Sequence, residues 1–550
     1  LSRSAYVAKV EKDKCVACGR CVEVCPAGAA KLGQKLCSKK AGGQVPEYPR
    51  QELPDATKWD HTKWSPNYRN DNRIETHESG TAPCKTACPA HVAVQGYLKL
   101  AAQGRYDEAL ALIKRENPLP AICGRVCNRR CEDACTRGRV DAAVAIDEVK
   151  KFIAQRDLDA ATRYVPPVVT PTRAGGFDQK IAVIGAGPAG LSCAFYLAEK
   201  GYKPVVFEKN ERPGGMLTYG IPSFKLQKDV IEAEVEIIRL MGAEFRYGVE
   251  VGRDVTLDEL REQGFKAFYV AIGCQGGRLA GIPGEDAEDV TVAVDFLREV
   301  NSGKIDELPG RTIVVGGGNV AIDVARNACR LGSEHVEMFC LESEAQMPAS
   351  EEERREAIED GAHISCGWGP KEIHLDEAGR VCGITFKRCT RVFDDEGRFA
   401  PEYDENDLRR VDADRVVMSI GQSIVWGDLL AGSKVELGRG QGALADPQTY
   451  QTAEPDIFVG GDVYTGPSFA IDAIAAGHEA AVSIHRFVQP GSTLTIGRNQ
   501  RRYTALDRDD VVLESYDNAS REVAHVDRER EKAAPFSEYV ETFTEEQVRA

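Results

Sequence analysis

The chain has 550 residues, of which 42% are hydrophobic and 28% charged, and its formal net charge is −16. This length exceeds what one hydrophobic core holds and predicts several domains. The acidic balance disfavours nucleic acid as a partner, because the phosphates would repel the chain. No apolar run reaches the roughly 18 residues of a membrane helix, and no basic start followed by an apolar stretch indicates a signal peptide. We therefore expect a cytoplasmic protein without a membrane span.

Eighteen cysteines are distributed unevenly: five lie in residues 15–37, six in residues 84–135, and seven are scattered through the remainder. Secreted disulfide scaffolds are short and spread their cysteines through the fold. Here two groups of cysteines precede a large body, which favours metal ligation over disulfides.

Residues 1–40 contain the first group and predict a small ferredoxin-like unit. The stretch "CVACGRCVEVCP" (15–26) has the C-x2-C-x2-C-x3-C-P spacing with which bacterial ferredoxins bind a [4Fe–4S] cluster. Zinc sites instead pair CxxC units a dozen or more residues apart. Since no second run of this type exists, either Cys25 or Cys37 completes the cluster, and the sequence does not choose. The candidate ligands of this unit are Cys15, Cys18, Cys21, Cys25 and Cys37.

Residues 41–80 are polar, lack a sustained period and predict an extended linker, whereas residues 81–170 predict a helical iron–sulfur domain. In "AVQGYLKLAAQGRYDEALALIKREN" (93–117), apolar residues recur at three- and four-residue spacing. In "CGRVCNRRCEDAC" (123–135), a cysteine stands at every fourth position, which would align the thiols on one helical face. With two upstream cysteines, this region offers six thiolates: Cys84, Cys88, Cys123, Cys127, Cys131 and Cys135.

Strands that alternate with helices begin near residue 178 and predict an α/β fold with two doubly wound, Rossmann-like domains. In "IAVIGAGPAGLSCAFYLAEKGYKPVVFEKN" (181–210), Gly185, Gly187 and Gly190 complete GxGxxG directly after an apolar strand. The first glycine permits the tight turn, the second the approach of a pyrophosphate, and the third the packing of helix on strand. Glu208 ends the next strand, about 20 residues on, where an acid can hydrogen-bond a ribose hydroxyl.

The second Rossmann-like pattern is "TIVVGGGNVAIDVARNACRLGSEHVEMFCLES" (312–343). Gly316, Gly318 and Ala321 complete GxGxxA, a variant that the helix packing tolerates. The next strand leads to Glu342. An acid at this place suits the 2′-hydroxyl of NAD, whereas NADP usually needs arginine for its 2′-phosphate. The pattern favours NADH unless Glu342 is only a solvated surface residue.

Residues 81–490 resemble the family of the glutamate synthase small subunit. Its relatives include the N-terminal part of dihydropyrimidine dehydrogenase and the large subunit of bifurcating NADH-dependent ferredoxin–NADP oxidoreductase. The motifs that carry the resemblance are "APCKTACP" (82–89), "GPAG" (187–190), "RPGGMLTYGIPSFKL" (212–226), "GGGNVAIDVAR" (316–326) and "IFVGGDVYTGP" (457–467). The resemblance implies FAD on the first Rossmann domain, at 178–300 and 426–490. A pyridine nucleotide is implied on a second domain, at 301–425, inserted into the first.

By position in these motifs, the resemblance places Gly214, Gly215 and Ile221 near the flavin and Asp462 near its ribityl or phosphate groups. The residues expected around FAD are Gly185, Gly187, Pro188, Ala189, Gly190, Glu208, Lys209, Gly214, Gly215, Ile221, Val251 and Asp462. The residues expected around NAD(H) are Gly316, Gly318, Asn319, Val320, Ala321 and Glu342. The flavin itself supplies the redox chemistry, and we assign no catalytic acid or base to the protein.

Three departures from the family pattern qualify this resemblance. NADPH-using members are expected to carry paired arginines where this chain has Leu341 and Glu342. The stretch "GQSIVWGD" (421–428) lacks the proline expected after its first two residues. Relatives also place a CxxC upstream of "APCKTACP", where this chain reads "NRIETHESGTAPC" (72–84). One of the two [4Fe–4S] clusters that the family holds in this region has therefore lost two ligands.

One cluster can still form in the helical domain. Cys84, Cys88 and Cys127 would supply three ligands, with either Cys123 or the non-cysteine Glu148 as the fourth. Glu148 lies near a position where the family can use a side-chain oxygen or amide ligand. The alternative is that Glu148 is an ordinary acid on a helix surface.

The remaining cysteines of this group, Cys131 and Cys135, allow two interpretations. They are left over from the lost cluster, or they join Cys25 and Cys37 in a third cluster between the two units. The two groups supply eleven cysteines, whereas three complete clusters need about twelve ligands. We expect two clusters, with three as the alternative.

These features predict an FAD-dependent NAD(P)H oxidoreductase. It would exchange hydride between NADH and FAD and pass single electrons through [4Fe–4S] clusters to or from a partner redox subunit or ferredoxin. The direction stays open, and electron bifurcation is one version of this function. The alternatives are the small subunit of an NADPH-dependent glutamate synthase, and an assembly or electron-relay subunit with an inactive nucleotide site. Glu342 argues against the first alternative, and the intact GxGxxA against the second.

Residues 491–550 are charged and weakly patterned, and they predict an extended polar tail that either docks within a larger complex or is disordered. Thr544 and Gln547 have the spacing of a capping box at a helix start. Only three residues follow, too few for a useful helix. We therefore expect the gene product to continue beyond residue 550.

Overall fold

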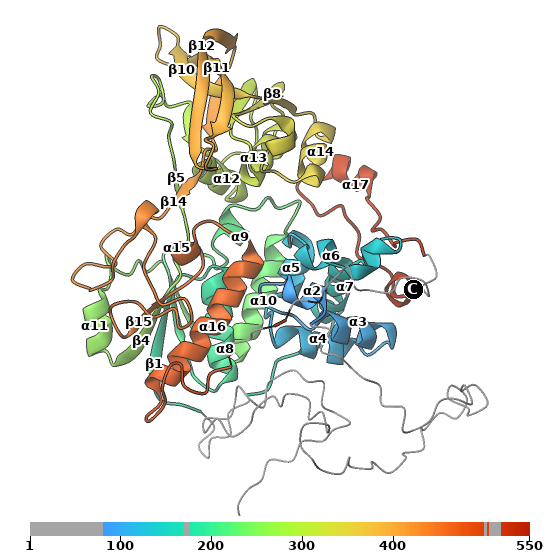
Figure 1. Ribbon diagram of the computed structural model, residues 1–550, viewed down its shortest axis with the longest axis vertical. Helices are drawn as coiled ribbons and strands as arrows, with labels where there is room; N and C mark the ends of the chain where they lie inside the picture. Colours follow the sequence, from blue (N-terminus) through green and yellow to red (C-terminus); the bar gives the residue numbers. More distant parts are fainter. Residues whose placement is uncertain (1–80, 169–175, 500–502, 505, 507–518) are drawn as a thin grey trace, which may run out of the picture.

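The computed structural model describes residues 81–168, 176–499, 503–504, 506 and 519–550. The predicted ferredoxin-like unit at 1–40 and the linker at 41–80 lie outside the described residues, and so do the five cysteines of residues 15–37. The described part consists of a helical domain, two parallel sheets with their helices, and an antiparallel extension (Figure 1). Among the helices that the structure describes, none combines the length and the apolar character needed to span a membrane.

The first parallel sheet has the strand order β15-β4-β1-β2-β3. Its inner strands are largely apolar because helices cover both faces of such a sheet, and Ile181, Ala182 and Val183 of β1 are fully buried. The edge strand β3 is partly exposed. The strands are β1 (Lys180–Ile184), β2 (Val205–Glu208), β3 (Glu244–Tyr247), β4 (Phe265–Val270) and β15 (Ile457–Val459). The helices are α8 (Pro188–Glu199), α9 (Met216–Tyr219), α10 (Lys228–Leu240), α11 (Leu257–Glu262), α15 (Asp462–Thr465) and α16 (Ala470–Val488).

The second parallel sheet has the strand order β6-β13-β7-β8-β9 and lies in the chain between β4 and β15. The two doubly wound domains predicted from the sequence are thus confirmed, the second inserted into the first. The strands are β6 (Val290–Val292), β7 (Arg311–Val315), β8 (His335–Cys340), β9 (His363–Cys366) and β13 (Arg415–Met418). The helices are α12 (Ala293–Asn301), α13 (Asn319–Arg330) and α14 (Glu351–Glu359).

A two-stranded ribbon of β5 (Gly276–Gly277) and β14 (Gln422–Ser423) joins the two domains. Because β6 pairs with β13 of the second sheet, we propose that the second domain begins between 278 and 289, ahead of the boundary at 301 suggested by the sequence.

An antiparallel sheet extends the second domain and was not anticipated from the sequence. It consists of β10 (Trp368–Leu375), β11 (Val381–Phe393) and β12 (Phe399–Val411), at the end of the upper lobe in Figure 1. Phe386 of β11 stacks on Phe339 of β8 with ring centroids 3.9 Å apart. This contact anchors the extension on the parallel sheet.

The described residues of the helical domain form six α-helices, two of which lie where the apolar spacing of residues 93–117 predicted helix. They are α2 (Pro83–Thr86), α3 (Val94–Ala102), α4 (Tyr106–Lys114), α5 (Pro120–Val126), α6 (Arg130–Asp133) and α7 (Ile146–Leu158). The prediction that residues 123–135 align four cysteines on one helical face is wrong. Helix α5 ends at Val126, Cys127 is extended, and Arg129 has a left-handed backbone with φ 53°. A turn therefore separates Cys123 from Cys131.

A buried ion pair joins the helical domain to the flavin domain. Lys114 Nζ of α4 lies 3.0 Å from Glu234 Oε2 of α10, and the two side chains are only 1% and 2% exposed. The other carboxylate oxygen of Glu234 accepts a hydrogen bond from the backbone N–H of Ala121, in the first turn of α5. One hydrophobic core continues from Ile122 to Ile231 across this boundary. The two domains are thus packed as one body.

The C-terminal residues 519–550 do not behave as the predicted extended tail. They contain α17 (Arg528–Ala533) and α18 (Glu545–Arg549), and Tyr539, Phe543 and Val548 are buried. The capping box at Thr544 and Gln547 is confirmed, with both reciprocal hydrogen bonds present. The short α18 forms because tertiary contacts add to its local signal, including a hydrogen bond from the Tyr106 hydroxyl to Glu545.

Replacing Glu234 with glutamine leaves Lys114 buried without a charged partner. We expect Glu234→Gln to lower the free energy of unfolding by about 3–5 kcal/mol, measured by chemical denaturation followed by circular dichroism. The exposed pair of Arg246 and Glu244 offers a matched control, because Glu244→Gln should cost no more than about 1 kcal/mol. Equal losses for the two variants would contradict the structural role of the buried pair.

Candidate cofactor sites

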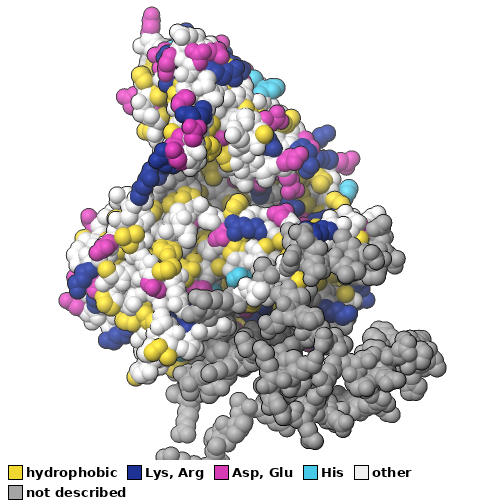
Figure 2. Space-filling view, in the orientation of Figure 1, with side chains coloured by type: hydrophobic (Ala, Val, Ile, Leu, Met, Phe, Trp, Pro, Cys, Tyr) yellow, Lys and Arg dark blue, Asp and Glu magenta, His cyan; other side chains and the backbone are white. Residues whose placement is uncertain are grey.

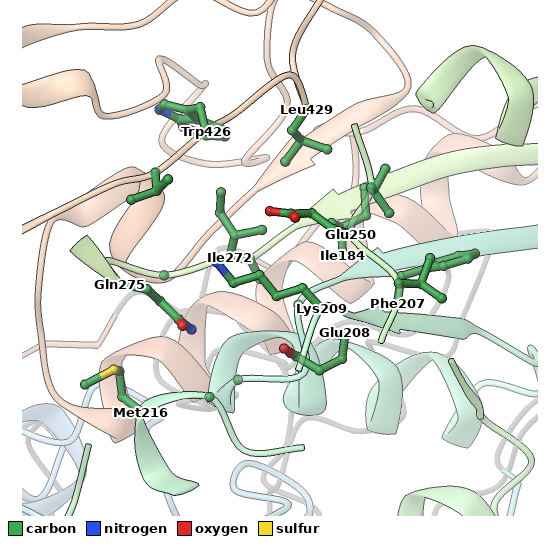
Figure 3. Close-up of a pocket in the computed structure, with 18 residues that line it drawn as sticks. Ile184, Phe207, Glu208, Lys209, Met216, Glu250, Ile272, Gln275, Trp426 and Leu429 are labelled. Carbon is green, nitrogen blue, oxygen red and sulfur yellow. The ribbon is translucent and has the colours of Figure 1, made fainter. Parts of the chain in front are cut away.

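The carboxyl ends of β1 and β2 open into a pocket on the first Rossmann domain (Figure 3). Glu208 ends β2 and Lys209 follows it, and both line this pocket together with Val251. Trp426 and Leu429, from the segment that returns from the second domain, cover the pocket from above in this view. Sequence reasoning did not identify Trp426 or Leu429, since they follow the glycine motif by more than 200 positions.

The glycine turn before α8 has the geometry of a pyrophosphate site. Gly185 has φ +103°, which favours glycine, and a Cβ at Gly190 would collide with the carbonyl oxygen of Gly185. A Cβ at Gly187 would meet no protein atom within 4 Å. Gly187 is the N-cap of α8 and leaves the helix without a side-chain cap. The open helix N-terminus suits an anion, and Pro188 and Ala189 continue it into a larger cavity.

Glu208 holds the loop around the adenosine end of this pocket. Its carboxylate accepts three hydrogen bonds, from the backbone N–H of Ala186 at 2.8 Å, the backbone N–H of Asn210 at 2.9 Å and the side-chain amide of Asn210 at 2.6 Å. A carboxylate has about four lone-pair sites, so capacity remains for a ribose hydroxyl. The residues therefore fit the adenosine and pyrophosphate parts of FAD.

A second turn supports the flavin side of the site. Gly214 donates its N–H to the carbonyl of Ala186 at 2.8 Å, and both Gly214 and Gly215 have positive φ. A Cβ at Gly215 would lie 3.0 Å from the Cα of Gly187, so this close approach needs glycine.

A cavity of about 630 Å³ continues from this turn and separates the two lobes. Figure 2 shows the molecule narrowing at this level, between the lobe of the second sheet and the body below it. Ile221 and Asp462 line the cavity from the flavin domain, and Asn319 and Val320 line it from the nucleotide domain. Cys127 lines it from the helical domain. All three domains thus meet at one cavity.

Charged groups in and beside this cavity have shifted pKa values. Burial raises the pKa of Asp462 to about 6, although the N–H of Ser468 opposes the shift. Burial lowers the pKa of Lys228 to about 7, and its ammonium group donates to the carbonyl of Leu217 at 3.2 Å. Lys225 Nζ, which the sequence interpretation also missed, lies 2.6 Å from Asp323 Oδ1 of α13 and also pairs with Glu353. Lys225 thereby connects the two lobes at the cavity wall.

The second glycine turn repeats the first. A Cβ at Gly316, where φ is +145°, would collide with the carbonyl oxygen of Ser419, whereas a Cβ at Gly318 would meet nothing within 4 Å. Gly318 is the N-cap of α13 without a side-chain cap, and Ala321 is fully buried. Glu342 lies just after β8, with its Oε2 3.0 Å from where a Cβ of Gly317 would stand. The turn and the acid therefore fit a dinucleotide.

The six cysteines of the helical domain are gathered in its interior and at its edge. Cys84, Cys88, Cys123 and Cys131 are buried, and Cys127 and Cys135 are partly buried. Burial raises the pKa of the thiols of Cys84, Cys88, Cys123, Cys127 and Cys131. Repulsion from neighbouring thiolates raises these pKa values further. Cys88 and Cys127 raise the pKa of Cys131, Cys88 raises that of Cys127, and Cys135 raises that of Cys84.

Lys150 supplies the positive charge among these thiols. Burial alone would lower its pKa, but Asp147, Cys127 and Cys123 raise it, so the buried ammonium group stays charged. Lys150 in turn lowers the pKa of Cys88, Cys123, Cys127 and Cys131 against the effect of burial. Thiolates are the form that binds iron–sulfur clusters. In the part of the chain that the structure describes, no three His, Cys, Asp or Glu side chains form a set that could hold a metal ion.

Glu148 lies apart from the cysteines. It lines a charged cavity of about 290 Å³ with Arg129 and Lys151, and no cysteine belongs to that lining. Burial raises the pKa of Glu148, and its Oε2 is buried without a hydrogen-bond partner. The neighbouring Asp147 is the acid whose charge acts on Cys127 and Cys131. The geometry favours Cys123 over Glu148 as a ligand, and this assignment stays a prediction.

A family model described as pyridine nucleotide-disulphide oxidoreductase matches residues 179–477. The chain belongs to this family. A model described as dihydropyrimidine dehydrogenase domain II, 4Fe-4S cluster, matches residues 75–162, and one described as a 4Fe-4S binding domain matches residues 8–31. The protein is therefore an FAD-dependent NAD(P)H oxidoreductase with iron–sulfur domains, as the sequence predicted.

Curated relatives place this oxidoreductase in the glutamate synthase small-chain group. It is 35% identical to the beta subunit of the NADP(+)-dependent formate dehydrogenase of Moorella thermoacetica, over 84% of this chain and 68% of that protein. It is 35% identical to the glutamate synthase [NADPH] small chain of Escherichia coli K12, over 74% of this chain and 89% of that protein. It is 32% identical to the NAD-dependent dihydropyrimidine dehydrogenase subunit PreT of Escherichia coli O157:H7, over 74% of this chain and 91% of that protein.

Replacing Gly187 or Gly318 with alanine should weaken the binding of FAD or of the nucleotide separately. Since neither Cβ meets protein within 4 Å, both variants should fold. We expect Gly187→Ala to lose FAD on gel filtration, and Gly318→Ala to retain FAD while its KM for the nucleotide rises roughly tenfold or more, because a methyl group would block the pyrophosphate. Flavin absorbance per protein and steady-state dye reduction measure the two effects. Normal FAD retention by Gly187→Ala would contradict the placement of the pyrophosphate.

Proposed function

We propose that the protein is a cytoplasmic electron-transfer subunit that exchanges hydride between NADH and FAD. It passes single electrons through [4Fe–4S] clusters to or from a partner redox subunit or ferredoxin. The observation that carries this proposal is the cavity of about 630 Å³, which is lined by the first turn of α8, the first turn of α13 and Cys127. Residues that we expect to bind flavin, nucleotide and cluster therefore line one cavity.

The protein's own residues prepare this cavity for electron transfer. The bound flavin would accept two electrons as hydride and release them singly. The N-termini of α8 and α13 would bind the two pyrophosphates. Leu217, Leu297 and Phe469 line the cavity and would exclude water from the reacting rings. The contacts of Lys225 with Asp323 and Glu353 would hold the lobes at a set separation.

The preference for NADH is inferred from Glu342. Its carboxylate lies beside Gly317 at the end of β8, where an acid would hydrogen-bond a ribose 2′-hydroxyl and repel a 2′-phosphate. The preceding Leu341 is apolar and supplies no cation. The printed names of the formate dehydrogenase and glutamate synthase relatives specify NADP(+) and NADPH, whereas that of PreT specifies NAD.

The role of small subunit in an NADPH-dependent glutamate synthase is the second candidate. The chain covers 89% of the Escherichia coli small chain, which favours this role, while Glu342 speaks against NADPH. A preference for NADPH, together with glutamate formation on addition of a glutamine-cleaving large subunit, would support it over the first proposal.

Exchanging Glu342 should change the nucleotide preference. We expect wild-type protein to reduce an artificial dye with a higher kcat/KM for NADH than for NADPH. The variant Leu341→Arg/Glu342→Arg should shift that ratio toward NADPH by roughly 10- to 100-fold, since a charge-assisted hydrogen bond is worth about 1.5–3 kcal/mol. Glu344→Arg is the control, because Glu344 is exposed two residues farther on. An unchanged ratio in the double variant would refute the role of Glu342.

Iron analysis tests the electron path. On anaerobically purified full-length protein, we expect about eight irons and eight acid-labile sulfides per FAD, which corresponds to two [4Fe–4S] clusters. About twelve would mean that Cys131 and Cys135 join the N-terminal cysteines in a third cluster. Dye reduction by NADH without any iron would remove the cluster relay from the proposal, and stoichiometric zinc in place of iron would overturn the electron-transfer function.

A further inference from the structure

Cys340 and Cys366 form a pair of thiols beside the nucleotide turn. They end the neighbouring parallel strands β8 and β9, in which their Cα atoms are register partners. The two Sγ atoms are 3.7 Å apart. Cys340 is 3% exposed, whereas Cys366 lies on the edge strand of the sheet and is partly exposed. Neither thiol belongs to the cysteine groups expected to bind clusters.

The backbone of this pair already has the spacing of a disulfide. Adjacent strands lie about 4.8 Å apart, and disulfides join Cα atoms separated by about 4.4–6.8 Å. Register partners in neighbouring strands also project their side chains from the same face of the sheet. Rotation of the two side chains could therefore bring the sulfur atoms from 3.7 Å to bonding distance without moving the strands apart.

Cys340 and the residue after Cys366 contact the backbone of Glu342, the acid of the nucleotide site. The backbone carbonyl of Glu342 accepts a hydrogen bond from the Cys340 thiol, with sulfur and oxygen 3.7 Å apart. It accepts a second hydrogen bond from the N–H of Gly367, the residue after Cys366, at 2.9 Å. A Cβ built on Gly317 would lie 2.9 Å from the Cβ and 3.5 Å from the Sγ of Cys340, so Cys340 lies directly against the glycine turn. A bond between the two sulfurs would remove the thiol that donates to Glu342 and would rotate the Cys340 side chain beside this turn.

We propose that Cys340 and Cys366 are a thiol–disulfide modification site that reacts with low-molecular-weight disulfides and lowers the affinity for the nucleotide when oxidised. The effect on affinity rests on the proposed NADH site around Glu342. The formation of the disulfide depends only on the position of the two thiols.

The reaction proceeds in two exchanges. The Cys366 sulfur, which is the accessible one, attacks a small disulfide RSSR, forms a mixed disulfide and releases one RS⁻. The Cys340 sulfur then attacks the Cys366 sulfur, the intramolecular disulfide forms, and a second RS⁻ leaves. The two thiol protons end on the two released RSH molecules, so the pair loses two electrons and RSSR gains them. Burial raises the pKa of Cys340, which agrees with its acting second.

The experiment treats the anaerobic, cofactor-loaded full chain with oxidised glutathione and blocks free thiols with N-ethylmaleimide. Peptide mapping by mass spectrometry should show a cross-link between Cys340 and Cys366. The dissociation constant for NADH, measured on the same sample, should rise about three- to tenfold, as expected if displacement of Glu342 breaks one hydrogen bond between its carboxylate and the ribose. Dithiothreitol should restore it, and an unchanged iron content would show that the clusters are intact.

Two cysteine variants make the test specific. Cys366→Ser cannot form the cross-link, and its NADH affinity should not respond to oxidised glutathione. Cys382→Ser removes a partly exposed thiol of β11 and should respond like the wild type. Absence of the cross-link would overturn the modification site, and a cross-link with unchanged NADH affinity would overturn its effect on the nucleotide. Failure of the reduced protein to bind NADH would instead overturn the proposed function, while the mapping still decides whether the disulfide forms.

Discussion

The ion pair between Lys114 and Glu234 is the constraint on which the arrangement of the cofactor sites depends. Both charges are withdrawn from water, so neither can tolerate separation from the other. Glu234 also binds the first turn of α5 through Ala121, and α5 carries Cys123 and leads to Cys127 at the cavity wall. A polar contact between two domains thereby fixes where the cysteines lie relative to the flavin domain.

Two further connections complete the enclosure of the cavity. Lys225 reaches from the flavin domain to Asp323 and Glu353 of the nucleotide domain. The C-terminal residues contact both the helical domain and the nucleotide lobe. In the nucleotide lobe, the buried Arg326 of α13, which is 1% exposed, donates a hydrogen bond to the hydroxyl of the C-terminal Tyr539 at 2.7 Å. In Figure 1, α17 runs beside the nucleotide lobe and the chain ends near α3 and α7. The three domains are therefore held around one cavity from several sides.

A buried positive charge offsets the free-energy cost of ionising the buried thiols. Burial raises the pKa of five thiols of the helical domain, those of Cys84, Cys88, Cys123, Cys127 and Cys131, because it penalises the charged form. Lys150 offsets this penalty where the thiols gather, and Asp147 keeps Lys150 itself charged. In the nucleotide lobe, burial and the neighbouring Cys366 and Glu342 raise the pKa of the Cys340 thiol.

The two Rossmann units, their glycine turns, Glu208 and the capping box at Thr544 could be predicted from local sequence patterns, because each depends on contacts within a few residues or within one strand–turn–helix unit. The break between α5 and α6, the sheet of β10 to β12, the packing of residues 519–550 and the pairing of Lys225 with Asp323 became apparent only in the folded chain. These features arise from contacts between residues far apart in the chain. In "CGRVCNRRCEDAC" the four-residue spacing indicated a single helix, but a left-handed turn at Arg129 divides it. On the two sides of this turn, α5 packs against α7 and α6 packs against α2.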